Sequence, residues 1–193
     1  MKPINISDKF TIYRGKYNYE YPIEDFLKYV EINHSLVSKN QNDSVSIEIK
    51  TDCFESINNY VKGHIEKISK KQFTNYAEHF WIYTQRLGYK MEWMHQHLQV
   101  HPPGRSNILT DYTFTFYLQT TTEISGDEGC IIFEDENKKR YKYLPEVGDI
   151  FIFPSDIRHT AVPTPNSKRE RIVYAGSFCI DIENQKVIQK NSI

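Results

Sequence analysis

The sequence is poor in glycine and cysteine and has no long apolar run. Its 193 residues include 8 glycines, far below the one in three of a collagen-like chain. The 3 cysteines are widely spaced and odd in number, which favours reduced packing thiols over a disulfide framework. No apolar stretch approaches the roughly 20 residues that span a bilayer, and charged residues follow the first few positions. We therefore expect a cytoplasmic protein that is not exported and has no membrane partner.

The charge balance and length restrict the function further. The formal net charge is -1, so the chain lacks the basic excess of a nucleic-acid-binding protein, and no nucleic-acid partner is expected. A length of 193 residues fits one domain, 1–193. The abundance of aromatic residues, with 14 tyrosines and 11 phenylalanines, favours a strand-rich core.

The first 75 residues have mixed periodicity. The aromatic, alternating segment 10–19 predicts an early strand, and segment 22–30 has helical spacing. Thr51 or Asp52 can cap a second helix, which continues to Ile68 with its apolar residues on one stripe. We interpret 1–75 as a mixed α/β region that supports the rest of the domain.

Short strand-like runs separated by turns dominate the chain from residue 76 to residue 182. Closely spaced strands without intervening helices predict antiparallel pairing, and so a sandwich, jelly roll or barrel. The expected strands are 79–85, 90–101, 112–119, 129–133, 139–144, 149–153 and 171–180.

Three histidines form a candidate metal site. His95 and His97 are two residues apart in a segment predicted as a strand, so both imidazoles can face one ion. His159 follows the apolar strand 149–153 and its Pro-Ser turn, and can supply a third ligand. Imidazole binds iron, zinc, copper and nickel alike, so these residues alone do not identify the metal.

An arginine follows the third histidine on a strand-like run. Arg171 shares a predicted face with small residues, which leaves room for an anion in front of its guanidinium. In segment 112–119 one face is apolar and the other carries Tyr117 and Gln119 among threonines. That polar face either meets solvent or lines a ligand cavity.

The region from Trp81 to Asp181 resembles the iron(II) and 2-oxoglutarate dependent oxygenases, in particular their small prolyl-hydroxylase-like and phage-encoded branch. The resemblance depends on the order and spacing of several motifs and not on any single one. The motifs are Trp81-Ile82-Tyr83, His95-Gln96-His97, Phe116-Tyr117-Leu118-Gln119, Gly126-Asp127-Glu128-Gly129, the run 145–155 leading to His159, and the run 171–178.

The resemblance implies a mostly β fold, a double-stranded β-helix of jelly-roll or cupin-like type flanked by helices. It implies Fe(II) as metal and 2-oxoglutarate as cosubstrate, with His95 and His159 as ligands. Arg171 would bind the distal carboxylate of 2-oxoglutarate, with the Tyr117 hydroxyl as second donor. With dioxygen, such a dioxygenase decarboxylates 2-oxoglutarate to succinate and hydroxylates its substrate, here of unidentified nature but by resemblance a peptide or protein side chain such as proline. No catalytic residue beyond the metal centre is implied.

The sequence departs from that family at one position. The family has aspartate two residues after the first histidine, where this chain has His97. The predicted ligand set is thus His95, His97 and His159, while His101 or Asp111 could replace His97 as third ligand. A cupin-like three-histidine metalloenzyme that does not use 2-oxoglutarate, and a non-catalytic jelly-roll structural or binding protein, are the alternative functions. His34, His64 and His79 lack comparable surroundings.

Overall fold

A computed structural model describes residues 1–17, 20–37, 44–46, 52–74, 76–85, 93–100, 108–122 and 124–183. These residues form two helices, α1 (Ile23–Val37) and α2 (Asp52–Ser69). Their strands are β1 (Lys2–Asn5), β2 (Thr11–Lys16), β3 (Ser44–Ser46), β4 (Ala77–Gln85), β5 (Gln99–Val100), β6 (Ile108–Leu109), β7 (Tyr112–Gln119), β8 (Ile131–Glu134), β9 (Arg140–Tyr143), β10 (Asp149–Pro154), β11 (Arg158–Ala161) and β12 (Arg171–Cys179).

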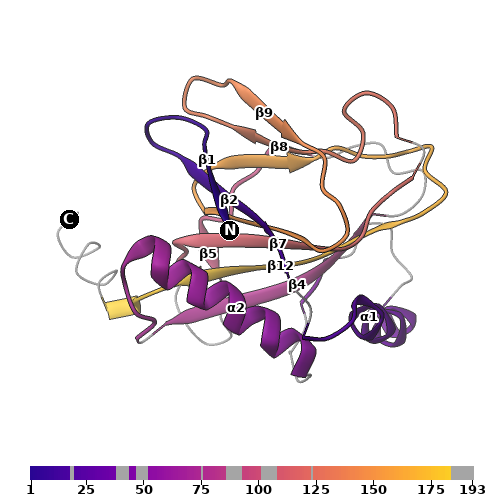
Figure 1. Cartoon of the computed structure of the whole chain (residues 1–193), viewed down its shortest axis with the longest axis horizontal. Helices are drawn as coiled ribbons and strands as arrows, with labels where there is room; N and C mark the ends of the chain where they lie inside the picture. The colour runs from indigo at the N-terminus through magenta and orange to yellow at the C-terminus, as the bar shows by residue number, and fades with distance from the viewer. Residues whose placement is uncertain are drawn as a thin grey trace.

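Two antiparallel sheets make up the body of the protein. The major sheet has the order β1-β2-β10-β7-β12-β4-β3, and the minor sheet has the order β11-β8-β9. Figure 1 shows β8 and β9 above the major sheet and α2 below it. From β2 to β4 the neighbours in the major sheet are non-consecutive strands, as in a jelly roll, so the predicted mostly β, double-stranded β-helix fold is confirmed.

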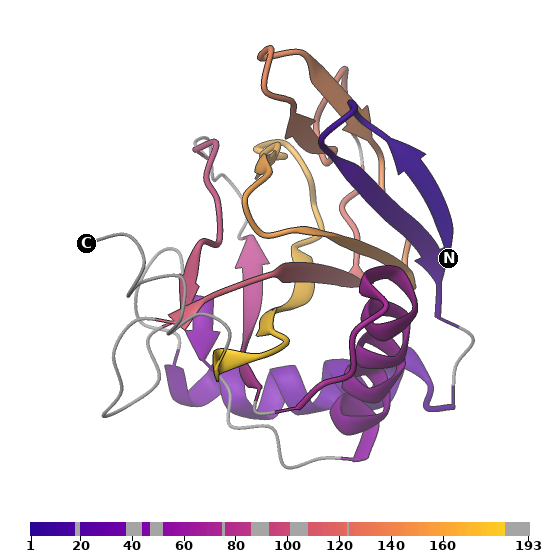
Figure 2. The same cartoon turned by 90° about the vertical axis from the view of Figure 1, so that its left-hand side faces the viewer.

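Helix α2 covers the outer face of the major sheet (Figure 2). Its stripe of Phe54, Ile57, Val61 and Ile65 is fully buried, because the spacing of these residues places them on one side of the helix. They pack with alternate residues of the sheet, including Tyr174, whose ring lies 4.7 Å from that of Phe54. The predicted amphipathic helix against a sheet is therefore present.

The opposite face of the major sheet points toward the minor sheet. Tyr117 on β7 is 1% exposed and belongs to a second core cluster that includes Phe133 of β8. Thr113 on the same face lies between the hydroxyls of Ser155 and Ser177, at 2.9 Å from each. Thr113 and Tyr117 of the polar face of 112–119 are thus interior, while Thr115 and Gln119 are partly buried.

Most predicted strands occur near the expected positions, and β7 spans the predicted residues. The expected strand 90–101 is wrong in part: residues 93–98 lie outside any strand apart from an isolated bridge at His95, and 90–92 and 101 lie outside the described residues. The strands β1, β3, β6 and β11 were not predicted from the sequence. β11 escaped notice because His159 was assigned to the turn after β10.

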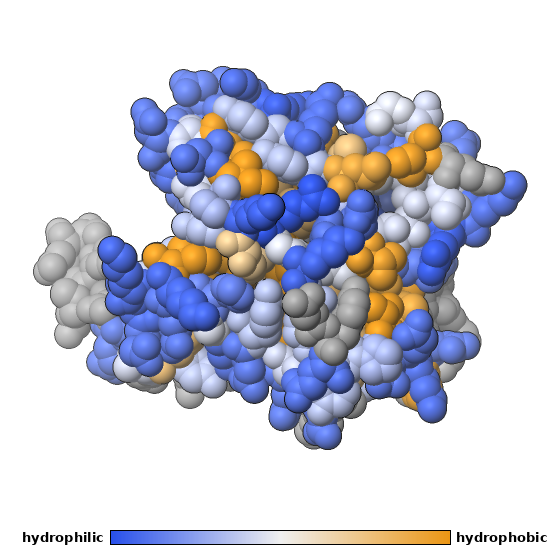
Figure 3. All heavy atoms as spheres, in the orientation of Figure 1, coloured by the Kyte–Doolittle hydropathy of each residue, from blue (hydrophilic) through white to orange (hydrophobic). Residues whose placement is uncertain are grey.

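The surface and the cysteines agree with the composition. No described helix has the length and apolarity that crossing a membrane requires. In Figure 3 apolar side chains form small separate patches within a largely hydrophilic surface. Cys53, Cys130 and Cys179 are buried and form no disulfide with one another, as expected of packing residues.

Gly176 on β12 provides a test of the packing between sheet and helix. A Cβ atom there would lie 2.7 Å from Cε1 of Phe114 and closer still to the ring of Phe80. We expect Gly176→Ala to lower the free energy of unfolding by about 1–3 kcal/mol, measured by urea denaturation. Gly63→Ala is the control, because a Cβ on that residue of α2 has no atom within 4 Å; it should stabilise by about 0.5–1 kcal/mol. Equal effects of the two changes would contradict this packing.

Candidate metal centre

A backbone bridge joins two of the three histidines. The N–H of His95 donates to the carbonyl of His159 at 2.9 Å, and the N–H of His159 donates to the carbonyl of His95 at 2.9 Å. The N–H of His97 donates to the carbonyl of Ser155 at 3.1 Å. The segment 95–97 is therefore held against β11 and the turn before it, although it is not itself a regular strand.

The three imidazoles converge. One ring nitrogen from each of His95, His97 and His159 lies within 4.8 Å of the others. Two nitrogens that bind one ion at about 2.1 Å each are separated by at most about 4.2 Å. A small rotation of the rings would thus bring all three nitrogens to one ion, and the donor set fits a divalent transition metal.

Hydrogen bonds to backbone carbonyls orient two of the rings. Nδ1 of His95 lies 2.8 Å from the carbonyl oxygen of Trp93, and Nδ1 of His159 lies 3.2 Å from that of Ile157. A carbonyl only accepts, so each Nδ1 carries the proton and each Nε2 presents its lone pair. Such bonds fix the tautomer and direction of metal-binding histidines.

Burial keeps the inner histidines neutral. Burial, followed by the proximity of His95 and His79, lowers the pKa of His97 to about 3. Burial also holds the pKa of His159 well below its ordinary value, and the neighbouring His97 and His95 act in the same direction. Both rings are therefore neutral at pH 7, which is the form that binds a metal.

Asp111, one of the alternative third ligands, is not part of this cluster. It immediately precedes β7, and its Oδ2 accepts a hydrogen bond from the N–H of Ile180 at 2.7 Å. Among the described residues, the histidine cluster includes no carboxylate. His101 lies outside the described residues. The arrangement thus favours His97 as the partner of His95 and His159.

Arg171 lies at the beginning of β12 and is 1% exposed. Its Nη1 donates to the carbonyl of Val162 at 3.1 Å, and its Cζ lies 5.8 Å from the centre of the Tyr83 ring. A guanidinium held in this way inside the jelly roll has N–H donors that suit a carboxylate. The side chain is not exposed to solvent, as it would be if it were an ordinary surface arginine.

Tyr117 is buried on the same inner face of the major sheet. It is paired with Val173, the residue that follows Arg171 by two positions on β12. Its ring packs edge-on against Phe151 at 6.0 Å. The expected role of its hydroxyl as a second carboxylate donor stays a prediction.

Two residues beside the histidines were not predicted as part of the site: Trp81 was noted only within a motif, and the expectation that His79 lacks comparable surroundings is wrong. The ring of Trp81 lies 4.9 Å from that of His97, and the ring of His79 lies 5.4 Å from that of Trp81. Both residues are on β4 at alternate positions, so they share its inner face. The alternating pattern of 77–85 indicates that His79 and Trp81 share a face of the strand. It does not indicate which part of the protein that face contacts.

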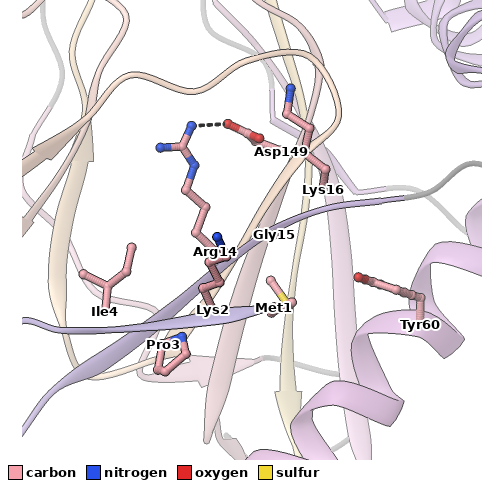
Figure 4. Close-up of a pocket in the computed structure, with 9 residues that line it drawn as sticks. All are labelled: Met1, Lys2, Pro3, Ile4, Arg14, Gly15, Lys16, Tyr60 and Asp149. Carbon is pink, nitrogen blue, oxygen red and sulfur yellow. Dashed lines mark hydrogen bonds and ion pairs between the residues drawn. The ribbon is translucent and has the colours of Figure 1, made fainter.

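A separate pocket of about 600 Å³ lies at the edge of the major sheet that β1 and β2 form. It is lined by β1, β2 and residues such as Tyr60 of α2, and it contains none of the three histidines. Arg14 and Asp149 both line it and form the ion pair drawn in Figure 4. Nη2 of Arg14 and Oδ2 of Asp149 are 2.5 Å apart. Asp149 is 1% exposed and also accepts from the N–H of Glu146, so this ion pair has a structural explanation.

Solved structures resemble this chain, whereas no protein-family model and no curated protein sequence matches it. Viral collagen prolyl hydroxylase from Paramecium bursaria Chlorella virus-1, in complex with 2-oxoglutarate, has 15% identity and a TM-score of 0.60, covering 86% of this chain and 95% of that one. A prolyl-4-hydroxylase from Pseudomonas putida has 12% identity and a TM-score of 0.57, covering 88% and 92%. HygX from Streptomyces hygroscopicus, with nickel and 2-oxoglutarate bound, has 8% identity and a TM-score of 0.61, covering 88% and 81%.

These similarities define the class of fold. The chain has the fold of the 2-oxoglutarate and iron(II) dependent oxygenases, including prolyl hydroxylases. The resemblance drawn from the motifs is therefore confirmed at the level of the fold. Activity and substrate are separate questions, because one fold supports many functions.

Nickel(II) binding to the untagged, metal-free protein tests the ligand set. A ligand present at 100 times its Kd stabilises the native state by about 2.7 kcal/mol, which corresponds to an increase in Tm of about 5–10 °C for a domain of this size. We expect this increase in the wild type and in Asp111→Asn, but not in His95→Ala, whose side chain is exposed and contributes little to packing. Loss of the shift in Asp111→Asn together with its retention in His97→Gln would identify Asp111 as the third ligand instead.

Proposed function

We propose that this protein is a non-haem Fe(II) and 2-oxoglutarate dependent dioxygenase that hydroxylates a peptide or protein side chain such as proline. The observation that carries the proposal is the convergence of three imidazole nitrogens within 4.8 Å inside a jelly roll of the oxygenase type. The buried guanidinium of Arg171 adds support, since a dicarboxylic cosubstrate needs a cationic partner.

The residues have distinct roles in this proposal. His95, His97 and His159 hold the metal, with the backbone bridge and the Nδ1 hydrogen bonds fixing the direction of two of the rings. Arg171 binds and orients the distal carboxylate, with the Tyr117 hydroxyl as second donor. Iron(II), when bound with 2-oxoglutarate and dioxygen, supplies oxidative decarboxylation of the 2-oxo acid and oxidation of a substrate C–H bond.

The choice of substrate depends on similarity alone. Two of the similar structures are named as prolyl hydroxylases, one of them acting on collagen by its name. HygX, which has comparable similarity, is not so named. A prolyl side chain is therefore the proposed substrate class. We likewise retain the cytoplasm as the proposed location, because the three cysteines are buried thiols.

One observation favours a second function, a three-histidine metalloenzyme that does not use 2-oxoglutarate. The described cluster has three neutral ligands and no carboxylate, so the site carries one more positive charge than a His-x-Asp set would. Whether 2-oxoglutarate binds to the metal-loaded protein distinguishes the two functions, since a native-state ligand must raise the Tm.

Anaerobic titration with Fe(II) and 2-oxoglutarate tests the first function. We expect a weak visible charge-transfer band, because the keto and near carboxylate groups of the 2-oxo acid can both bind the iron. The band should be absent in His95→Ala under the same conditions. Folded, iron-loaded wild-type protein that develops no band would refute the use of 2-oxoglutarate and favour the second function.

Replacement of Arg171 tests the carboxylate site. Arg171→Lys keeps the charge but loses the paired N–H donors, and we expect its Kd for 2-oxoglutarate to rise about 10- to 100-fold. Arg169→Lys is the matched control, because Arg169 is exposed and two residues away. Calorimetric titration of the anaerobic, nickel-loaded variants measures both constants. Equal Kd values for 2-oxoglutarate in the two variants would show that Arg171 does not bind the cosubstrate.

A further inference from the structure

Gln85 at the end of β4 is a buried amide without a hydrogen-bond partner among the described residues. Its side chain is 3% exposed, and neither Nε2 nor Oε1 makes a hydrogen bond. Buried side-chain amides in native proteins are nearly always bonded, because desolvating them without a partner costs stability. A leucine would fill a similar volume without this cost, so the amide needs a functional explanation.

The position of Gln85 indicates which ligand could bond to it. Gln85 is paired directly with Arg171 in the register between β4 and β12. Residues directly opposite each other in antiparallel strands project from the same face, with their Cβ atoms about 4.5–5.5 Å apart. Tyr83, two positions earlier on β4 and thus on the same face, lies under the guanidinium of Arg171. The amide and the guanidinium are therefore neighbours on the inner face of the major sheet.

A second glutamine provides an internal comparison. Gln119 ends β7, the strand on the other side of β12, and its Nε2 donates to the carbonyl of Glu170 at 2.8 Å. The side-chain amide of Gln119 thus has a backbone partner, as expected of a glutamine with a structural role. Gln85 has no such partner within the described residues, although it is the more deeply buried of the two.

We propose that Gln85 is a cosubstrate-binding residue that donates an N–H from Nε2 to the distal carboxylate bound by Arg171. A carboxylate offers about four lone-pair positions, so it can accept from the guanidinium and from an amide at the same time. This inference depends on the proposed function. It adds a residue that makes the site selective for a 2-oxo acid with a second carboxylate, because an uncharged chain end would leave the amide unbonded.

The test compares two ligands on nickel-loaded, anaerobic protein. 2-Oxoglutarate has the distal carboxylate, whereas 2-oxopentanoate has the same chain length without it. Isothermal titration calorimetry gives both Kd values for the wild type, Gln85→Leu and the control Gln119→Leu. Gln85→Glu is a second variant of nearly the same shape, in which a carboxylate replaces the donor.

We expect Gln85→Leu to raise the Kd for 2-oxoglutarate about 10- to 100-fold, the usual effect of losing a hydrogen bond to a charged group. The Kd of this variant for 2-oxopentanoate should stay within about twofold of the wild-type value. Gln85→Glu should raise the Kd for 2-oxoglutarate at least as much, because the new side-chain carboxylate would repel the distal carboxylate of the ligand. The ligand-free Tm of Gln85→Leu should equal or exceed that of the wild type, since an unbonded amide is removed. Gln119→Leu should lower the Tm and keep the affinity for 2-oxoglutarate.

Different results overturn different statements. If the wild type binds nickel but not 2-oxoglutarate, the proposed function fails and this inference with it. If the wild type binds 2-oxoglutarate and Gln85→Leu binds it equally well, only the role of Gln85 is refuted. An equal loss for both 2-oxo acids, or an equal loss in Gln119→Leu, would indicate a general disturbance of the sheet and also refute it.

Discussion

The candidate site depends on one pair of backbone hydrogen bonds, those that join His95 to His159. Segment 93–98 forms no regular strand, so its local structure fixes the direction of its side chains only where Nδ1 of His95 bonds to the carbonyl of Trp93. The bridge attaches this segment to β11, and the bond from His97 to Ser155 attaches it to the turn between β10 and β11. All residues of β10 except its last, Pro154, are buried in the major sheet. The position of the imidazoles is therefore transmitted from the rigid sheet through the backbone.

The two faces of the major sheet have different roles, since one packs against α2 and the other holds buried polar residues. The outer face packs against α2 through a continuous aromatic and aliphatic cluster, which gives the sheet its stability. Because that face and the helix bury most of the large apolar side chains, the inner face can hold polar residues such as Thr113, Gln85 and Arg171. Buried polar groups need partners. Within the described residues the hydroxyl of Thr113 has them, whereas the side-chain amide of Gln85 has none.

The charges in the interior follow a consistent pattern. Burial makes His97 and His159 neutral, so they are prepared to bind a cation without competition from protons. Arg171 keeps its positive charge in a buried position, because a guanidinium does not lose its proton in proteins. In the proposed function, a metal ion held by three neutral ligands and the buried guanidinium would both favour a dianionic ligand.

The sequence by itself determined the strands with clear alternation, β7, β10 and β12, and the apolar stripe of α2, because these patterns are local and have a fixed period. It also identified His95, His97, His159 and Arg171 as candidates, through their types and order. Only the tertiary structure decided that the polar face of β7 is interior, that His97 and not Asp111 joins the other histidines, and that Gln85 lies beside Arg171. Each of these depends on pairing between residues far apart in the chain, and such pairing is set by sheet register and packing, which no local pattern encodes.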